Sequence, residues 1–162
     1  MTHPFPELLT MSLDEVAAFI AGPNDACISI TERGDASLSG NFAGVLRVHF
    51  ADIPWPEYAQ HEQQITAAIA DQIVAFALHH RNARRLVIHC AAGASRSVST
   101  AMSLSVHLAR RWWFPRWFND DRRRERWVPN PNVFNAIAHA CERAAVPGHV
   151  VLAPERQPRS IR

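Results

Sequence analysis

Residues 86–97 read LVIHCAAGASRS, an apolar run that ends on Cys90 and passes through small residues to Arg96. The first residues have the composition of a buried strand, and Arg96 opens a long helical pattern. The small side chains between them leave room for backbone amides to surround an anion. The stretch therefore predicts a strand, an anion-binding loop and a helix in succession.

Length and composition limit the class of protein. The chain has 162 residues, 48% of them hydrophobic, which suits one domain with a proper core. Its formal net charge is only +2, and no apolar run approaches the roughly 18 residues of a membrane span. We therefore expect no transmembrane segment and no nucleic-acid partner. The first residues do not read as a secretory signal, so a cytoplasmic location is the default expectation.

Hydrophobic periodicity predicts further elements around residues 86–97. We expect strands at 26–31, 45–50 and 86–89, and helices at 13–21, 57–80, 97–111 and 132–145. A capping box formed by Ser12 and Glu15 marks the start of the first helix. Alternating strands and helices predict an α/β fold, a single domain with a mainly parallel central sheet flanked by helices. We expect this domain to cover residues 1–146 and residues 147–162 to form a loosely attached tail.

Cys90 has the surroundings of a nucleophile. A free thiol is mostly protonated at neutral pH, and positive potential is needed to favour the thiolate. Arg96 lies six residues on, where a tight loop can fold its guanidinium over the sulfur, and the start of the next helix adds its amides. The same groups can bind the oxygens of a phosphoryl group. The thiolate would then lie in line to attack phosphorus.

The other loop residues fit this chemistry. Gly93 is expected to adopt a positive φ, and Ser97 offers a hydroxyl close to the sulfur that can stabilise the thiolate. The ring of His89 is expected to bind loop carbonyls at the strand end. The phosphate site would consist of the residues from the strand end to the arginine: His89, Ala91, Ala92, Gly93, Ala94, Ser95 and Arg96.

The pattern His-Cys-x-x-Gly-x-x-Arg-Ser at residues 89–97 resembles the signature of the cysteine-based protein tyrosine phosphatases, in particular a bacterial, dual-specificity-like member. All 17 basic residues are arginines, which resembles the codon bias of a GC-rich bacterial genome. The resemblance covers roughly residues 26–140. It implies that Cys90 forms a phosphocysteine intermediate, that Arg96 holds the phosphate, and that an aspartate from another loop protonates the leaving oxygen and later activates water.

Asp52 is the candidate for this aspartate. It lies 38 positions before Cys90 and follows a predicted strand, as the resemblance to dual-specificity members implies. The prolines that follow it would stiffen its loop. Alternatively, Asp52 only ends the strand with a turn-type hydrogen bond. Glu57 is the fallback acid, and Asp71 is disfavoured because it falls in the middle of a predicted helix.

A Pro-Asn segment at residues 129–132 is similar to the one that precedes the last helix of dual-specificity members. There an asparagine helps to fix the phosphate loop. Here either Asn130 or Asn132 could take that role, and either could simply cap the helix. Low-molecular-weight phosphatases, arsenate reductases and rhodanese-type sulfurtransferases are remote options, because their loops differ in position or length.

Several features have competing interpretations. Residues 110–127 hold seven arginines and three acidic residues among bulky aromatics, and form either an anion-recognition surface or a solvated excursion, which we favour. His79, His80 and His89 lack the spacing of a metal site, so we expect no metal and no cofactor. The third unassigned feature is Cys27, which is either a core residue or a redox partner of Cys90.

The sequence therefore predicts a metal-independent, cysteine-dependent phosphomonoester hydrolase in which Cys90, Arg96, Asp52 and Ser97 are catalytic. Its expected partner is a phosphorylated protein or a small phosphomonoester. The competing hypothesis is a non-catalytic phosphate-binding or regulatory module of the same fold. The physiological substrate and the oligomeric state stay open.

Overall fold

The computed structural model describes residues 5–55, 63–108 and 127–144. Four strands are present in these ranges: β1 (Glu7–Met11), β2 (Asp25–Thr31), β3 (Gly44–His49) and β4 (Arg85–His89). The helices are α1 (Leu13–Ala18), α2 (Ala67–His79), α3 (Arg96–His107) and α5 (Pro131–Arg143). This is the predicted α/β architecture.

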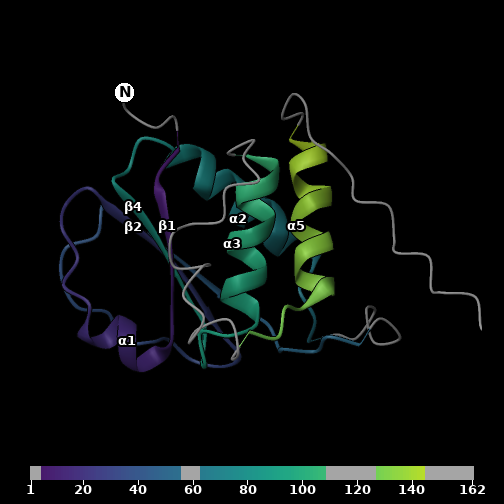
Figure 1. Ribbon diagram of the computed structural model, residues 1–162, viewed down its shortest axis with the longest axis horizontal. Coiled ribbons are helices and arrows are strands. Elements are labelled where there is room, and N and C mark those ends of the chain that lie inside the picture. The colour runs from purple at the N-terminus through teal and green to yellow at the C-terminus, as the bar shows by residue number, and fades with distance from the viewer. Residues whose placement is uncertain (1–4, 56–62, 109–126, 145–162) are drawn as a thin grey trace, which may run out of the picture.

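The described strands form one parallel sheet in the order β1-β4-β2-β3. Strand β4 lies inside the sheet, between β1 and β2. Because all four strands run the same way, their carboxyl ends meet at one edge. Helices α3 and α5 both begin at this edge, at the bottom of Figure 1. The loop after β4 is therefore placed where ligands bind in open α/β sheets.

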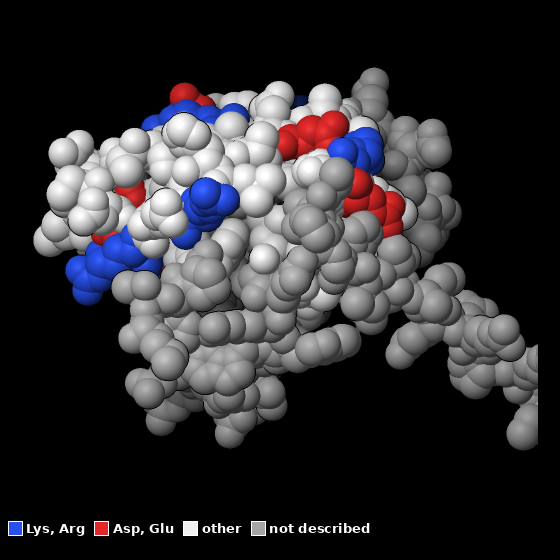
Figure 2. Space-filling model, turned by 90° about the horizontal axis from the view of Figure 1, so that it is seen from above, with Lys and Arg blue, Asp and Glu red and all other residues white. Residues whose placement is uncertain are grey.

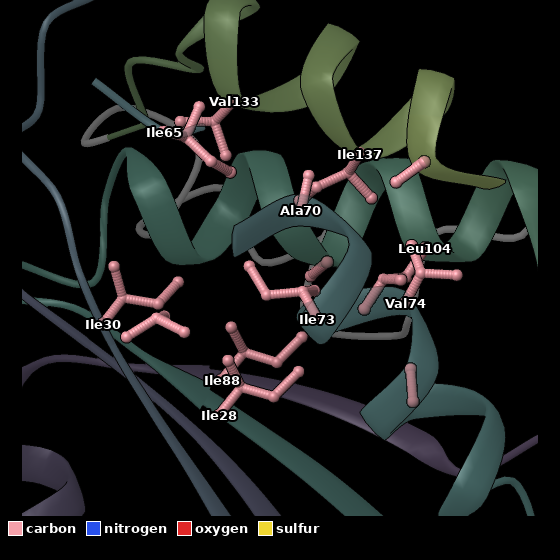
Figure 3. Close-up of a cluster of buried hydrophobic side chains, with 14 of the residues drawn as sticks. Ile28, Ile30, Ile65, Ala70, Ile73, Val74, Ile88, Leu104, Val133 and Ile137 are labelled. Carbon is pink, nitrogen blue, oxygen red and sulfur yellow. The ribbon is translucent and has the colours of Figure 1, made fainter. Parts of the chain in front are cut away.

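Both faces of the sheet are covered. Alternate residues of the central strands pack against α2, α3 and α5, and Figure 3 shows this core with ten residues labelled: Ile28, Ile30, Ile65, Ala70, Ile73, Val74, Ile88, Leu104, Val133 and Ile137. The other face, with Cys27 and Val87, packs against α1 through Val16. Burial on both faces explains why the central strands read as continuous apolar runs.

Strand β1 was not predicted. Its sequence, ELLTM, contains one β-branched residue and follows a proline-rich start, so it gives little strand signal. It pairs in register with β4 from Glu7 opposite Arg85 to Met11 opposite His89. The pairing with an interior strand, rather than local propensity, determines this element.

Two helices are shorter than predicted. Helix α1 has the predicted capping box of Ser12 and Glu15 but ends at Ala18, because Ala21 instead forms a parallel bridge with Gly40. Helix α2 begins after Thr66, whose hydroxyl accepts the Ile69 amide at 3.2 Å. The predicted helix over 57–80 was therefore wrong for residues 63–66, and residues 57–62 lie outside the described ranges.

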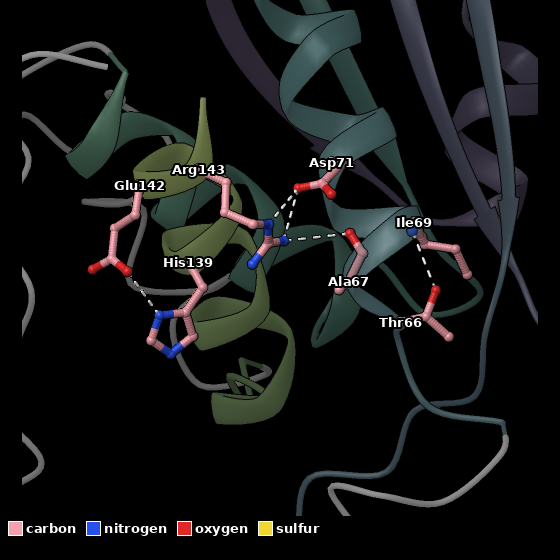
Figure 4. A network of polar contacts seen from close by, with 7 residues as sticks. All are labelled: Thr66, Ala67, Ile69, Asp71, His139, Glu142 and Arg143. Carbon is pink, nitrogen blue, oxygen red and sulfur yellow. Dashed lines mark hydrogen bonds and ion pairs between the residues drawn. The ribbon is translucent and has the colours of Figure 1, made fainter. Parts of the chain in front are cut away.

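Polar contacts join the helices on the outer side of the domain. Arg143 of α5 donates to Asp71 of α2 at 3.0 and 2.7 Å and to the Ala67 carbonyl at 3.4 Å (Figure 4).

On the face seen in Figure 2, the described arginine, aspartate and glutamate side chains are scattered among uncharged residues. None of the helices described is long and apolar enough to cross a membrane. The predicted tail, 147–162, lies outside the described residues.

An ion pair closes the amino-terminal end of the sheet. Arg85 donates through Nε to Asp25 at 2.9 Å and through Nη2 at 2.5 Å, and the Asp25 side chain is only 2% exposed. Arg85 also lies over the ring of Phe19, 4.7 Å from its centroid. The hydrogen bonds from Arg85 hold the pKa of Asp25 below its ordinary value, against the opposing effect of burial.

We predict that Asp25→Asn lowers the free energy of unfolding by about 2 kcal/mol at neutral pH, because it leaves Arg85 without its charged partner. A carboxylate with a lowered pKa stabilises the fold fully above its unfolded value, and this contribution is lost as the pH falls through the folded value. The difference in free energy of unfolding between wild type and variant, measured with urea, should therefore become smaller below about pH 4. A difference that stayed constant down to that range would contradict this assignment.

Candidate active site

The loop between β4 and α3 has the form of a phosphate site. Cys90 follows the last residue of β4 and is 2% exposed, and α3 begins at Arg96. The Cys90 Sγ lies 3.2 Å from the Ser97 Oγ. The Ser97 hydroxyl therefore lies close to the Cys90 sulfur, as expected from the sequence.

Strand β1 and the start of α1 hold this loop in place. The Cys90 amide donates to the Met11 carbonyl at 3.2 Å, and the Leu13 amide donates to the Ala91 carbonyl at 3.1 Å. Gly93 has a φ of +69°, as expected, and a Cβ there would lie 2.7 Å from the Ser12 nitrogen. Gly93 is required both for its φ and for this close approach.

The first turn of α3 has no side-chain cap among the described contacts. Ser95 is the N-cap residue, yet among the described contacts its side chain makes no capping bond to the helix. Its hydroxyl donates instead to Asp52. The amide groups at the helix start, together with the positive end of the helix dipole, are therefore left to bind an anion.

Arg96 is held rigidly beside the loop. Its side chain is 4% exposed and its Nη1 donates to the Phe50 carbonyl at 2.7 Å. Its buried Nε has no hydrogen-bond partner within the described part of the chain. A buried guanidinium with an unsatisfied donor suits an oxyanion ligand, which can accept from two of its nitrogens at once.

His89 stiffens the end of β4. Its Nε2 lies 2.7 Å from the Ser29 Oγ on the neighbouring strand β2. Burial lowers the pKa of His89 to about 4, and the backbone of Cys90 beside the ring offsets only part of that effect. The ring is therefore neutral at physiological pH. The ring Nδ1 has no hydrogen-bond partner among the described residues, so the predicted bond from this ring to loop carbonyls is absent there. The Ser29 contact was not predicted, because it depends on the register of two strands that are far apart in the sequence.

Asp52, three residues after the end of β3, contacts the loop between β4 and α3. Its Oδ1 accepts from the Ser95 Oγ at 2.7 Å and from the Asn130 Nδ2 at 2.8 Å. No hydrogen bond to its Oδ2 is present among the described residues. One carboxylate oxygen is thus fixed by two donors, and the other has no hydrogen-bond partner in the described part of the chain. The interpretation of Asp52 as a plain strand-ending residue does not account for these contacts.

Both asparagines at the start of α5 contact the segment around Asp52. Asn130 caps the helix with its Oδ1, which accepts from Asn132 at 3.0 Å and Val133 at 3.2 Å, and it holds Asp52 with its Nδ2. Asn132 instead donates to backbone carbonyls of residues 53 and 55. The sequence left open which asparagine supports the phosphate loop. Among the described contacts neither side chain bonds that loop directly, and the two hold different parts of residues 52–55.

The other candidates lie apart from this loop or outside the described residues. Asp71, on α2, binds Arg143 of α5 away from the sheet edge. Glu57 and residues 110–126 lie outside the described ranges. Within the described ranges, no group of three His, Cys, Asp or Glu side chains could hold a metal ion.

Cys27 is not positioned to react with Cys90. All three cysteines are free and buried, and burial raises the pKa of the Cys27 thiol to about 12. The strand register places Cys27 opposite Val87, three residues before Cys90, which corresponds to about 10 Å along a strand. A disulfide requires Cα atoms within about 7 Å. The geometry favours the core interpretation of Cys27.

One solved structure supports the fold, and two others match less closely. The crystal structure of human DUSP28 matches with a TM-score of 0.55 at 16% identity, covering 90% of this chain and 98% of that chain. The chain has a tyrosine-phosphatase-like fold. PTPMT1 in complex with PI(5)P matches with a TM-score of 0.46 at 18% identity, covering 75% of this chain and 78% of that chain. The tyrosine phosphatase OH1 from the Orf virus matches with a TM-score of 0.44 at 18% identity, covering 90% of this chain and 86% of that chain. No family model and no curated protein matches the sequence.

A comparison of two glycine variants tests how the loop is held. Gly93 and Gly34 have similar φ angles, +69° and +65°, but a Cβ at Gly34 would meet nothing within 4 Å. We predict that Gly34→Ala lowers the free energy of unfolding by about 1 kcal/mol, the cost of the positive φ alone. Gly93→Ala should cost about 2 kcal/mol more, because the new methyl group collides with backbone between β1 and α1. Equal losses in urea unfolding would show that this close approach is unimportant.

Proposed function

We propose that this protein is a phosphomonoester hydrolase of the cysteine-based tyrosine phosphatase superfamily, of the dual-specificity-like type. The observation that carries the proposal is the contact between Asp52 and Ser95, 2.7 Å long, which joins a candidate proton donor to the loop of the candidate nucleophile. A nucleophile, a cationic phosphate anchor and a carboxylate then share one site. The phosphatase fold agrees with this proposal.

In the proposed first step, the Cys90 thiolate attacks phosphorus and the bond from phosphorus to the leaving oxygen breaks. Asp52, protonated on Oδ2, gives its proton to that oxygen, so the alcohol or phenol leaves uncharged. Arg96 and the loop amides stabilise the charge on the equatorial oxygens in the transition state. The product is a phosphocysteine, and the Asp52 carboxylate is now ionised.

In the second step, water attacks the phosphocysteine and the sulfur–phosphorus bond breaks. The Asp52 carboxylate takes a proton from the water, and inorganic phosphate leaves. The Ser97 hydroxyl, 3.2 Å from the sulfur, donates to the thiolate as it forms. These two steps use only side chains and backbone amides of this protein, and we propose that no metal or cofactor takes part.

The substrate is proposed to be a phosphorylated protein or a small phosphomonoester. The loop residues Ala91 and Ala92 are exposed and uncharged, so the loop itself offers no side chain to bind a second phosphate. We also infer a bacterial source and a reducing compartment such as the cytoplasm. The first rests on the arginine-only basic composition and the second on three free cysteines, one of which must be a thiol to react.

The second candidate function is a phosphate-binding or regulatory module without turnover. The unsatisfied Nε of Arg96 and the free amides of α3 would serve such a module equally well. The contact of Asp52 with the loop favours the hydrolase, because a binding module gains nothing from a carboxylate held beside a dianion. Turnover separates the two candidates.

We predict that Cys90→Ser abolishes hydrolysis of an aryl phosphate, because a serine hydroxyl at this site is a far weaker nucleophile than a thiolate. The matched control is Cys27→Ala, which changes a buried cysteine outside the loop and should keep turnover. Phosphate release is the measurement, with circular dichroism to verify the fold of both variants and vanadate to occupy the site. Substantial turnover by folded Cys90→Ser protein would reject the mechanism, and a wild type that binds vanadate without turnover would favour the module.

A further inference from the structure

Two side-chain amides hold the backbone of residues 53–55, which follow the candidate acid; we refer to residues 51–55 as the acid loop. Asn132 donates through Nδ2 to the Ile53 carbonyl at 3.0 Å and to the Trp55 carbonyl at 3.2 Å. Gln64, which is 3% exposed, donates through Nε2 to the same Ile53 carbonyl at 2.6 Å. The two amides come from segments far apart in the sequence, one just before α2 and one at the start of α5.

Among the described contacts, the side-chain amide of Asn132 donates only to the acid loop. Asn130 already caps α5, and the Asn132 side chain makes no contact with its own helix among the bonds described. Both hydrogens of one amide nitrogen are directed at carbonyls two residues apart. Such a pair of bonds fixes the direction of the backbone between them, where no strand or helix does so.

The position of Asp52 depends on this backbone. The contacts to Ser95 and Asn130 fix its Oδ1, but Oδ2 can still turn about that anchor if residues 53–55 shift. Proton transfer in a transition state requires near hydrogen-bond geometry, and a displacement of about 1 Å can cost about 100-fold in rate. An anchor on the backbone beyond the carboxylate removes this freedom.

We infer that Asn132, assisted by Gln64, is a positioning residue that aligns Asp52 for proton transfer by clamping the acid loop. The inference rests on the proposed hydrolase function and adds two residues whose side chains make no hydrogen bond to the loop around Cys90 among the described contacts. Asn132 would therefore affect the proton transfer from Asp52 to the leaving oxygen. Binding of the phosphoryl group and attack by the thiolate do not depend on it.

The variant Asn132→Asp separates positioning from stability. A carboxylate cannot donate to two carbonyls and is repelled by them, so the clamp opens. At the second position of α5, however, a negative charge interacts favourably with the helix dipole. The variant should therefore unfold at a urea concentration close to that of wild type while its acid step slows, because the favourable charge at the helix start offsets much of the loss of the two hydrogen bonds. A residue with a purely structural role would lose activity and stability together.

The test is the dependence of kcat/KM on the leaving group. A good leaving group such as nitrophenol needs little protonation, and a poor one such as phenol needs the acid. For Asn132→Asp we expect kcat/KM to fall about tenfold or more with phenyl phosphate and by less than about threefold with nitrophenyl phosphate. Asn132→Ala, which removes the donors without adding charge, should show the same selectivity. The matched control is Asn135→Asp, which places the same charge on an exposed position of α5 and should match wild type on both substrates.

A double-mutant comparison completes the test. In an Asp52→Asn background the acid is already absent, so adding Asn132→Asp should lower kcat/KM for phenyl phosphate by no more than about twofold. A full tenfold further loss there, or equal losses on both substrates in the single variant, would overturn the inference. Absence of turnover in the wild type, or turnover by Cys90→Ser, would instead overturn the proposed function, so the two failures are distinguishable.

Discussion

The carboxylate of Asp52 is the junction on which the site depends. Its Oδ1 accepts hydrogen bonds from Ser95 in the phosphate loop and from Asn130 at the start of α5. Three segments far apart in the sequence are joined at one oxygen atom. Removing this atom would separate the acid loop from the phosphate loop and would leave the buried amide of Asn130 without a partner.

Parallel topology makes this junction possible. Strands β3 and β4 end at the same edge of the sheet, so Asp52 and Cys90 are brought to one place although 38 positions separate them. The interior position of β4 buries the strand before the nucleophile on both faces. Strand β1 adds the Met11 carbonyl that binds the Cys90 amide, and the same segment approaches Gly93 closely at Met11 and Ser12. The loop is thus constrained at its start and at its middle.

The sequence was sufficient for the local parts of this arrangement. Apolar runs, a glycine and the spacing from Cys90 to Arg96 are contiguous signals, and the predicted strand, loop and helix are present with the Ser97 hydroxyl beside the sulfur. The capping box at Ser12 was equally local. Asp52 could be selected because the resemblance supplied the expected order of acid and nucleophile.

The remaining parts depend on long-range contacts that leave no pattern in a single sequence. Strand β1 forms through its pairing with β4, and the partners Ser29, Met11 and Gln64 are set by strand register and by the path of the loops. The end of α1 was misplaced because a bridge to Gly40 competes with helix formation. Both asparagines at the start of α5 were noticed in the sequence, but only the structure divides their contacts between the Asp52 side chain and the backbone that follows it.

The most direct measurement is rapid chemical quenching of the protein during turnover of an aryl phosphate, followed by peptide mass spectrometry. The account predicts a phosphoryl group on the peptide that contains Cys90, attached through sulfur, and a larger amount of it in Ser97→Ala protein because release of the thiolate is slowed. A burst of phenol equal to the enzyme concentration should accompany it. Turnover with no phosphorylated cysteine, or with the phosphoryl group on another residue, would contradict the account.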